Sequence, residues 1–462
     1  MIQQAFHPLT PAIVERLVAI VGPAHVSTTE ADRAQHARDM SGHAPRSPEA
    51  VVWPASAQEV ADILKLAGDH HVPVTAWGAG TSLEGNPIPV CGGIVLSTQR
   101  MQAIVAIHDH DFQVTVQPGI GYKDLNANLA RYGLFYAPDP GANATIGGML
   151  ANNAAGIRTV KYGACKDNVL RLQVALPDGR LIHCGSRSVK QASGYDLLHL
   201  FVGSEGTLGI ITEATLRLVP IPQFLSAVVV GFPSVEAAVE AVVAVRGSGL
   251  EPAALEFIDA HHARMLSQEG EVDLGQNPTL FMEFHAVAPS ELQLGLDLVR
   301  GICAECGALD FRATADPTDR QRLWHARHHA YENALRNHPG QEFVILDVAV
   351  PISRYPALVA HVQQALEETG MVGYMLGHAG DGNLHVLLPF PDVATYDKAL
   401  VVNDAIVTKA LALDGTATGE HGVGIGKSRY LLQEHGGAVV VMQALKQLLD
   451  PTGIMNPGKI FS

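Results

Sequence analysis

The stretch Pro73-Val74-Thr75-Ala76-Trp77-Gly78-Ala79-Gly80-Thr81-Ser82 joins a short apolar segment to a glycine-rich loop. We predict a strand over 73–77, because β-branched and aromatic residues favour extended backbone. The loop from Gly78 to Ser82 offers unblocked backbone N–H groups and two hydroxyls, which suit a pyrophosphate. It is not the dinucleotide fingerprint, because a third glycine and a following helix are missing. An ordinary turn is the alternative interpretation of this loop.

The segments around this loop predict a mixed domain. Ser56-Ala57-Gln58-Glu59 is a capping box that starts a helix, which we expect to run to about His70. Strands are expected over 93–97 and 112–117. A hairpin is expected over 169–184, because Pro177-Asp178-Gly179 is typical of a turn. The first half of the chain is therefore predicted to be α+β with short connections.

Two further segments of this half are unusually rich in small residues. Pro138 to Gly148 runs into Ala151 to Gly156, and Gly203 to Ile210 follows later. Backbone with small side chains can lie flat against a large planar ligand, because glycine allows close approach. Each segment alone is explained by turns. Three such segments in one domain favour a bound ligand.

The second half begins at Pro220-Ile221-Pro222, which indicates a boundary. Strand and helix patterns then alternate as β-α-β sets between Leu225 and Phe390, which predicts an antiparallel sheet covered by helices on one face. The last 45 residues are again glycine-rich and are expected to return to the first domain. We therefore divide the chain into segments 1–222, 223–415 and 416–462.

Composition limits the function classes. Of 462 residues, 47% are apolar and 17% charged, which is typical of well-packed domains, and the net charge of −15 disfavours nucleic acid as partner. No run approaches 18 apolar residues, so we expect no transmembrane segment. The N-terminal residues lack the pattern of a signal peptide. Five cysteines suit a reducing compartment. We expect the cytoplasm or the periphery of the inner membrane.

The segment Gly377-His378-Ala379-Gly380-Asp381-Gly382-Asn383-Leu384-His385 places two histidines around a tight turn, and Thr418-Gly419-Glu420-His421-Gly422 follows. If a hairpin sets the imidazoles side by side, they and Glu420 form the donor set of a catalytic Zn²⁺ or Mn²⁺ site. Asp381 is the alternative carboxylate. A metal would lower the pKa of a bound hydroxyl, and His421 could take its proton.

The segment Trp324-His325-Ala326-Arg327-His328-His329 is dense in cationic groups. Arg327 could clamp a carboxylate through two N–H groups. A solvated helix face is the alternative interpretation.

In combination, these segments resemble the FAD-linked D-2-hydroxyacid dehydrogenases of the vanillyl-alcohol oxidase/p-cresol methylhydroxylase superfamily. Cytochrome-type D-lactate dehydrogenases look nearest, with the glycolate oxidase flavin subunit and D-2-hydroxyglutarate dehydrogenase alongside. The similarity extends from about Ser47 to Ile460. The segments that carry it are Trp77 to Gly85, Pro138 to Gly148, Ser193 to Leu197, Gly203 to Ile210, Gly377 to His385, Gly419 to Gly424 and Asn456 to Ile460.

This resemblance implies a two-subdomain FAD-binding domain of the p-cresol methylhydroxylase type and a ferredoxin-like, antiparallel-sheet substrate domain. No residue for covalent attachment is evident, so FAD is expected to bind non-covalently. The implied cofactor contacts are Gly78, Ala79, Gly80, Thr81, Ser82, Pro138, Gly141, Thr145, Gly148, Asn152, Gly156, Glu205, Gly206, Ile210 and Asn456, with Lys459 closing the site. His378, His385 and Glu420 would bind the metal. His421 would be the base, and Arg327 would pair with the substrate carboxylate.

Two departures from the hydroxyglutarate enzymes indicate the substrate. Those enzymes carry a lysine where this chain has Ile345, and an asparagine where it has Leu387. A distal carboxylate buried against apolar side chains lacks a partner. The resemblance thus implies oxidation of D-lactate or a similar small D-2-hydroxy acid by hydride transfer to flavin N5. Electrons would pass to cytochrome c, a quinone or an electron-transfer flavoprotein.

Several alternatives stay open. D-2-hydroxyglutarate and glycolate dehydrogenases are rivals within the same class. A metal-dependent hydrolase without flavin would explain the histidines if the glycine segments are only turns. A homodimer is compatible with the sequence.

Overall fold

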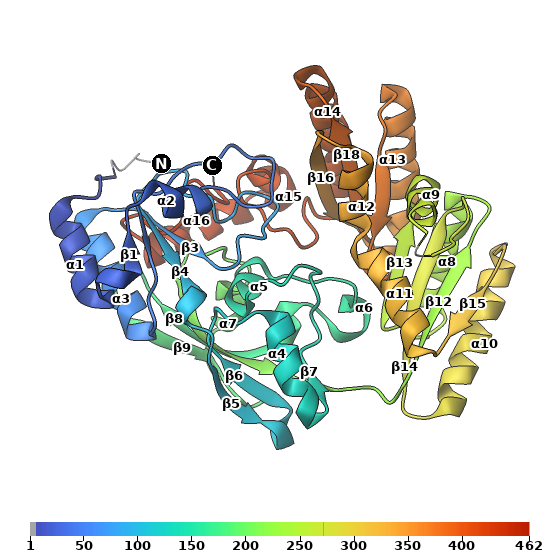
Figure 1. The fold of residues 1–462 in the computed structure, drawn as a ribbon, viewed down its shortest axis with the longest axis horizontal. Helices are drawn as coiled ribbons and strands as arrows, with labels where there is room; N and C mark the ends of the chain where they lie inside the picture. Colours follow the sequence, from blue (N-terminus) through green and yellow to red (C-terminus); the bar gives the residue numbers. More distant parts are fainter. Residues whose placement is uncertain (1–5, 271, 462) are drawn as a thin grey trace. The chain divides into compact units, whose positions relative to one another are not determined.

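The computed structural model describes residues 6–270 and 272–461, which form two compact units (Figure 1). The first unit comprises Met1–Ala155, Gly163–Ile221 and Glu420–Ser462. The second comprises Gly156–Tyr162 and Pro222–Gly419. These units differ from the expected segments at three places, 156–162, Pro222 and 416–419, all of which belong to the second unit.

The first unit begins with a four-stranded sheet of order β1 (Val26–Ser27), β2 (Ala50–Val52), β4 (Ile94–Ser97), β3 (Val74–Trp77). Strands β2 and β3 both run parallel to β4. Ser56 caps α3 (Ala57–His70) by accepting the Glu59 N–H, as predicted, and the Glu59 carboxylate accepts the Ala55 N–H at 2.7 Å. Near the C-terminus, the Val74 N–H donates to Ile454 and Asn456 N–H donates to Val74, so this segment extends the β3 edge.

A second, five-stranded antiparallel sheet carries the rest of the first unit. Its order is β5 (Ile104–His108), β6 (Gln113–Val116), β10 (Ile210–Arg217), β8 (Val169–Ala175), β9 (Leu181–Gly185). Its core includes Leu150 of α5 (Ile146–Asn152) and Phe201 of α7 (Leu198–Phe201). The remaining elements of this unit are α1 (Pro11–Val21), α2 (Glu30–Gln35), α4 (Tyr122–Leu129), β7 (Leu134–Phe135), α5 (Ile146–Asn152), α7 (Leu198–Phe201), β11 (Val219–Pro220), α15 (Leu431–His435) and α16 (Ala438–Leu449).

The second unit is built on a seven-stranded antiparallel sheet. Its order is β15 (Arg312–Thr314), β12 (Phe224–Gly231), β14 (Thr279–Ala286), β13 (Ala254–Ile258), β17 (Tyr374–Gly377), β18 (Asn383–Phe390), β16 (Glu342–Ala349). Its helices are α6 (Thr159–Tyr162), α8 (Val235–Gly247), α9 (Ala260–Gln268), α10 (Pro289–Glu305), α11 (Pro317–His328), α12 (Ala330–Asn337), α13 (Tyr355–Thr369) and α14 (Val393–Ala412).

Helices contact both faces of this sheet, so the expectation of one covered face is wrong. Residues of α9, α11 and α12 form one buried cluster with Phe281, Leu376 and Leu387. Helix α10 contacts Phe284, which points to the opposite face because side chains alternate along β14. The central strands are apolar on both faces, and each apolar face must be covered. The predicted α+β class with an antiparallel second domain is confirmed.

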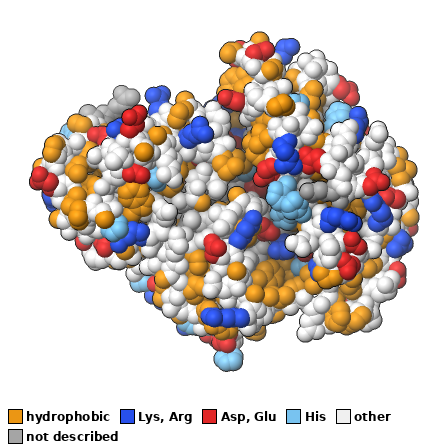
Figure 2. Space-filling view, in the orientation of Figure 1, with side chains coloured by type: hydrophobic (Ala, Val, Ile, Leu, Met, Phe, Trp, Pro, Cys, Tyr) orange, Lys and Arg blue, Asp and Glu red, His pale blue; other side chains and the backbone are white. Residues whose placement is uncertain are grey.

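The surface shows mixed charge. On the face in Figure 2, acidic and basic side chains of the described residues are interspersed, and the basic ones form no continuous patch there. Within residues 6–270 and 272–461, no helix is both long enough and apolar enough to cross a membrane.

Candidate cofactor pocket and metal centre

The first unit contains a cavity whose walls are mostly backbone and small side chains. The loop after β3, the start of α5 and the segment before β10 all line it. Of the predicted contacts, the lining includes Gly78, Ala79, Gly80, Thr81, Ser82, Thr145, Gly148, Asn152, Glu205, Gly206, Ile210 and Asn456. Pro138, Gly141 and Gly156 are not among the lining residues, although Pro140 and Ala142, which flank Gly141, are.

Glycine is required where two of these segments meet. A Cβ atom on Gly78 would lie 2.3 Å from Thr145 Oγ1, and one on Gly80, whose φ is +70°, would lie 2.5 Å from the Trp77 ring. Thr145 Oγ1 also caps α5 by accepting the Gly148 N–H at 3.3 Å. The glycines therefore let the loop after β3 pack directly on the start of α5, which leaves a wall of backbone.

Asn86 lines this cavity and was missed by the sequence analysis. Its Nδ2 donates to Glu205, whereas its Oδ1 is buried and has no hydrogen-bond partner. A buried acceptor without a donor costs roughly 1–3 kcal/mol, which a ligand N–H or O–H would offset. Small walls and an unsatisfied acceptor fit FAD, a large planar ligand that carries both kinds of donor. The only sequence signal for Asn86 was its place four residues beyond the glycine loop.

Glu205 fixes the loop that follows His421. Its carboxylate is buried and accepts the N–H groups of Val423 at 2.6 Å and Gly424 at 2.9 Å. Burial raises the pKa of Glu205, and these hydrogen bonds oppose the rise. Asn456 Nδ2 donates to the Glu205 carbonyl at 2.8 Å, so three distant segments meet at this residue.

His421 and Glu420 both line the same cavity. The backbone carbonyl of His421 accepts from Asn152 Nδ2 at 3.3 Å, which ties it to α5. Lys459 is buried below the 456–460 turn, where its Nζ donates to the Ile88 carbonyl at 2.5 Å. Burial lowers the pKa of Lys459 to about 8.

In the second unit, β17 and β18 form the hairpin that holds the two histidines. His378 directly follows β17, His385 lies in β18 opposite Leu376, and the imidazole centroids are 5.3 Å apart. Gly382 has a φ of +71°, and a Cβ there would lie 2.0 Å from the Val350 carbonyl oxygen. The turn therefore needs glycine, and the imidazoles lie side by side.

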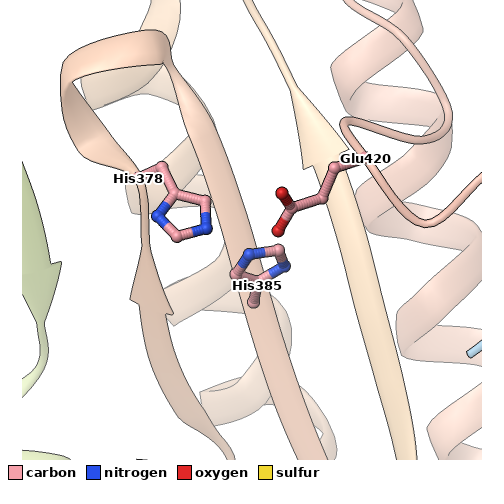
Figure 3. Close-up of side chains that lie close together, drawn as sticks. All are labelled: His378, His385 and Glu420. Carbon is pink, nitrogen blue, oxygen red and sulfur yellow. The ribbon is translucent and has the colours of Figure 1, made fainter. Parts of the chain in front are cut away.

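Donor atoms of His378, His385 and Glu420 lie within 4.8 Å of one another. Figure 3 shows both imidazoles and the carboxylate pointing toward one another. Glu420 directly follows Gly419, the last residue of the second unit. Two imidazoles and one carboxylate are a donor set that fits a catalytic Zn²⁺ or Mn²⁺. Asp381, the alternative carboxylate, is not part of this group of described residues.

Glu256 lies beneath His378 and was missed by the sequence analysis. It is fully buried on β13, and its Oε1 lies 2.8 Å from His378 Nδ1. Arg327 Nη2 donates to its Oε2 at 2.5 Å. Burial alone would raise the pKa of Glu256, but its interactions with His378 and Arg327 hold that pKa below its ordinary value. In sequence, Ala254-Leu255-Glu256-Phe257-Ile258 is an apolar strand with one isolated acid.

Arg327 does not lie on a solvated helix face, so that alternative is wrong. Its side chain is 6% exposed, and its Nε is buried without a hydrogen-bond partner. A buried guanidinium with an unused N–H can bind an anion such as a carboxylate.

Asp347 holds the chain segment that precedes Glu420. It is fully buried on β16 and accepts from Asn383 Nδ2 at 2.7 Å and from Thr418 Oγ1 at 2.9 Å. Thr416 pairs with Ala349 through an isolated bridge. The chain just before Glu420 is thus attached to the edge strand of the sheet.

Ile345 and Leu387 both contact the apolar cluster of the second unit. Leu387 is 2% exposed and Ile345 packs against the same cluster as Phe281 and Leu376. Along β18, Leu387 points to the same face as His385, because side chains two residues apart share a face.

Comparisons with known proteins identify the families to which the two halves of the chain are similar. Residues 48–185 match a model of the FAD binding domain, and residues 221–460 match the C-terminal domain of FAD linked oxidases. The chain is 40% identical to a probable mitochondrial D-lactate dehydrogenase from Danio rerio, over 97% of this chain and 92% of that protein. It is 33% identical to a glycolate oxidase subunit from Bacillus subtilis, over 98% and 97%.

Solved structures agree on the fold. The p-cresol methylhydroxylase structure aligns over 97% of this chain and 96% of its own with a TM-score of 0.78 at 14% identity. The 4-ethylphenol oxidase from Gulosibacter chungangensis gives a TM-score of 0.78 at 16% identity, with the same coverage. The two domain models and the relatives at 33–40% identity define an FAD-linked oxidoreductase. The chain belongs to the FAD-linked oxidase family, as the sequence predicted.

Proposed function

We propose that this flavoenzyme oxidises a small D-2-hydroxy acid, best D-lactate, to the 2-keto acid and passes the electrons to a separate acceptor. Relatives from Danio rerio and Arabidopsis thaliana, 40% and 39% identical, are named D-lactate dehydrogenases. The observation that carries the proposal is buried Arg327, whose unpartnered Nε is the donor that a substrate carboxylate would satisfy. Acceptors that fit are cytochrome c, a quinone or an electron-transfer flavoprotein.

Arg327 binds the substrate carboxylate in this proposal. One of its nitrogens, Nη2, already donates to Glu256, so the guanidinium is held in place before substrate arrives. Because the group is buried, water competes weakly for its remaining N–H groups, and a charge-assisted hydrogen bond there is strong.

His378, His385 and Glu420 would hold a divalent cation, Zn²⁺ or Mn²⁺. Such a cation, when bound, would lower the pKa of the 2-hydroxyl group of the substrate. His421 takes the proton of that hydroxyl as general base. Its backbone is tied to Asn152, and the loop behind it is held by Glu205, so the imidazole is carried on an ordered segment.

The glycine-lined cavity of the first unit would hold FAD without a covalent bond. FAD, when bound, would take the C2 hydride at N5 and pass the electrons on. The chain contributes a flat backbone wall at Gly78 to Ser82 and the Asn86 acceptor.

Ile345 and Leu387 support a small or apolar substrate side chain. A second carboxylate near them would be buried without a partner, which costs several kcal/mol. D-2-hydroxyglutarate is therefore disfavoured. Glycolate stays a candidate, because it has no side chain and a 33% identical relative is named a glycolate oxidase subunit.

Anaerobic flavin bleaching tests the proposal. The purified, FAD-loaded chain should lose its yellow absorbance with D-lactate and not with L-lactate. Prior treatment with a chelator should prevent this bleaching, and Zn²⁺ or Mn²⁺ should restore it. The substrate panel includes D-2-hydroxybutyrate, glycolate and D-2-hydroxyglutarate. If none of these D-2-hydroxy acids or glycolate bleaches the flavin, the proposed activity is wrong.

A further inference from the structure

We infer that Glu256 is a positioning residue that orients the metal ligand His378 and the carboxylate-binding Arg327 at the same time. This inference rests on the proposed function and adds a residue to it. One buried carboxylate would then set both the affinity for the cation and the affinity for the substrate.

The sheet itself brings Glu256 and His378 together. Phe257 of β13 pairs with Gly377 of β17, so the residues before and after them, Glu256 and His378, are the next pair along the two strands. Both Glu256 oxygens lie close to His378 Nδ1, at 2.8 Å and 3.0 Å. The contact joins residues 122 positions apart in sequence.

This contact fixes the state of the His378 ring. An ionised carboxylate only accepts hydrogen bonds, so Nδ1 carries the hydrogen and donates it. The lone pair then lies on Nε2, which becomes the atom that binds a cation. A carboxylate behind a ligating histidine also raises the basicity of the imidazole, and loss of such partners typically lowers metal affinity about 10–100-fold.

The second oxygen of Glu256 fixes Arg327. Oε2 accepts from Nη2 at 2.5 Å, and the carboxylate is 0% exposed while the Arg327 side chain is 6% exposed. Without Glu256, a buried guanidinium would lack its counter-charge and would rotate toward other acceptors. Its unpartnered Nε would then no longer point at a defined place.

Glu283 offers a matched control on the same face of the same sheet. It pairs with Ala254, two residues before Glu256, and is 3% exposed. Its carboxylate contacts His285 Nε2 at 2.6 Å and lies 3.8 Å from Arg158 Nε. Glu283 is thus a buried carboxylate between a histidine and an arginine, like Glu256. Neither of its partners is a proposed ligand of the metal or of the substrate.

The test compares Glu256→Gln with Glu283→Gln in the full-length, FAD-loaded protein. A glutamine has one acceptor oxygen for two donors, so either His378 or Arg327 loses its partner. After chelation, Mn²⁺ binding is measured by calorimetry and Co²⁺ binding by its visible absorption. We expect the Mn²⁺ Kd of Glu256→Gln to rise about 10–100-fold and the Co²⁺ bands to shift. With the metal saturating, its KM for D-lactate should rise about tenfold, whereas Glu283→Gln should stay within threefold of wild type throughout.

The outcomes separate the two claims. If the wild-type protein binds neither Mn²⁺, Zn²⁺ nor Co²⁺, the proposed metal centre is wrong. If wild type binds metal and Glu256→Gln binds it within threefold as tightly, with unchanged Co²⁺ bands, the inference about Glu256 is overturned. Should Glu256→Gln not fold, Glu256→Asp is measured instead. Its shorter carboxylate cannot span both partners, so a Kd about tenfold above wild type supports the inference and a wild-type Kd overturns it.

Discussion

The two units form their candidate sites from different material. In the first unit, the cavity is made of backbone, and glycines such as Gly78 and Gly80 allow two segments to touch. In the second unit, the polar end of one sheet face is made of side chains, and the fully buried carboxylate of Glu256 holds His378 and Arg327. A site made of backbone is disturbed by any added Cβ atom. A site made of buried charges is disturbed when one charge is removed, because its partner stays buried.

Replacing a proposed metal ligand of the second unit should therefore abolish metal binding and leave FAD binding intact. We expect His378→Ala to bind no Mn²⁺ or Zn²⁺ and to lose D-lactate oxidation by about 10⁴-fold or more, because a Lewis acid contributes several kcal/mol. FAD content should be near wild type. Metal analysis and stopped-flow flavin reduction check this. His110→Ala, at an exposed histidine of the first unit, is the control. Full metal content in His378→Ala would contradict the assigned donor set.

His421 sharpens the comparison, because it is a side chain that lines the backbone-built cavity. We expect His421→Ala to slow flavin reduction about a thousandfold, a typical effect of losing a general base. FAD and metal content should be unchanged, since neither is assigned to this imidazole. Stopped-flow reduction under anaerobic conditions measures the rate. A wild-type rate would show that another group takes the proton.

In the first unit, the corresponding experiment adds one Cβ atom to the backbone wall of the cavity, at Gly78. The Cβ of Gly78→Ala would meet Thr145 Oγ1 at 2.3 Å, so the loop or the start of α5 must move. Overpacking of this kind costs roughly 1–3 kcal/mol, and we expect about a tenfold weaker FAD affinity with unchanged metal content. FAD release followed by fluorescence provides the measurement. Gly437→Ala is the control glycine, because it has negative φ and no neighbour within 4 Å. Equal FAD affinity in the two variants would mean that the glycine wall does not contact the cofactor.

The comparison also explains how much of the site was predictable. The glycine segments and the paired histidines can be recognised from short stretches of sequence, because each is an unusual local combination of residues. Glu256, Asp347 and Asn86 are single polar residues in otherwise unremarkable segments. Their roles depend on strand register, which joins Glu256 to a residue 122 positions away. The covering of both sheet faces was missed for a similar reason, since the strand patterns did not reveal which helices return to which face.

The smallest expected effect is a pH dependence of stability caused by His262 of α9, the helix that packs on the apolar end of the sheet face carrying Glu256. His262 is fully buried beside the cluster that contains Leu387, and its Nε2 lies 3.1 Å from the Ala330 carbonyl. Burial, assisted by the charge of Arg327, lowers the pKa of His262 to about 3, far below its ordinary 6.5. Between these values the unfolded chain binds one proton more than the folded chain. Stability from His262 is therefore complete above pH 6.5 and is lost as the pH falls toward 3.

We expect the second unit to lose up to about 1.4 kcal/mol of unfolding free energy per pH unit through His262 below pH 6.5. Trp324 lies in this unit and the other tryptophans, Trp53 and Trp77, lie in the first, so Trp53→Phe/Trp77→Phe protein reports the second unit by fluorescence. Urea unfolding between pH 7.5 and 5 should show this slope, and His262→Gln in the same background should flatten it. Parallel slopes for the two proteins would mean that His262 is protonated within the fold. The fold would then hold the positive charge of His262 beside the apolar cluster. Buried charge would not be confined to the end of the sheet that carries Glu256.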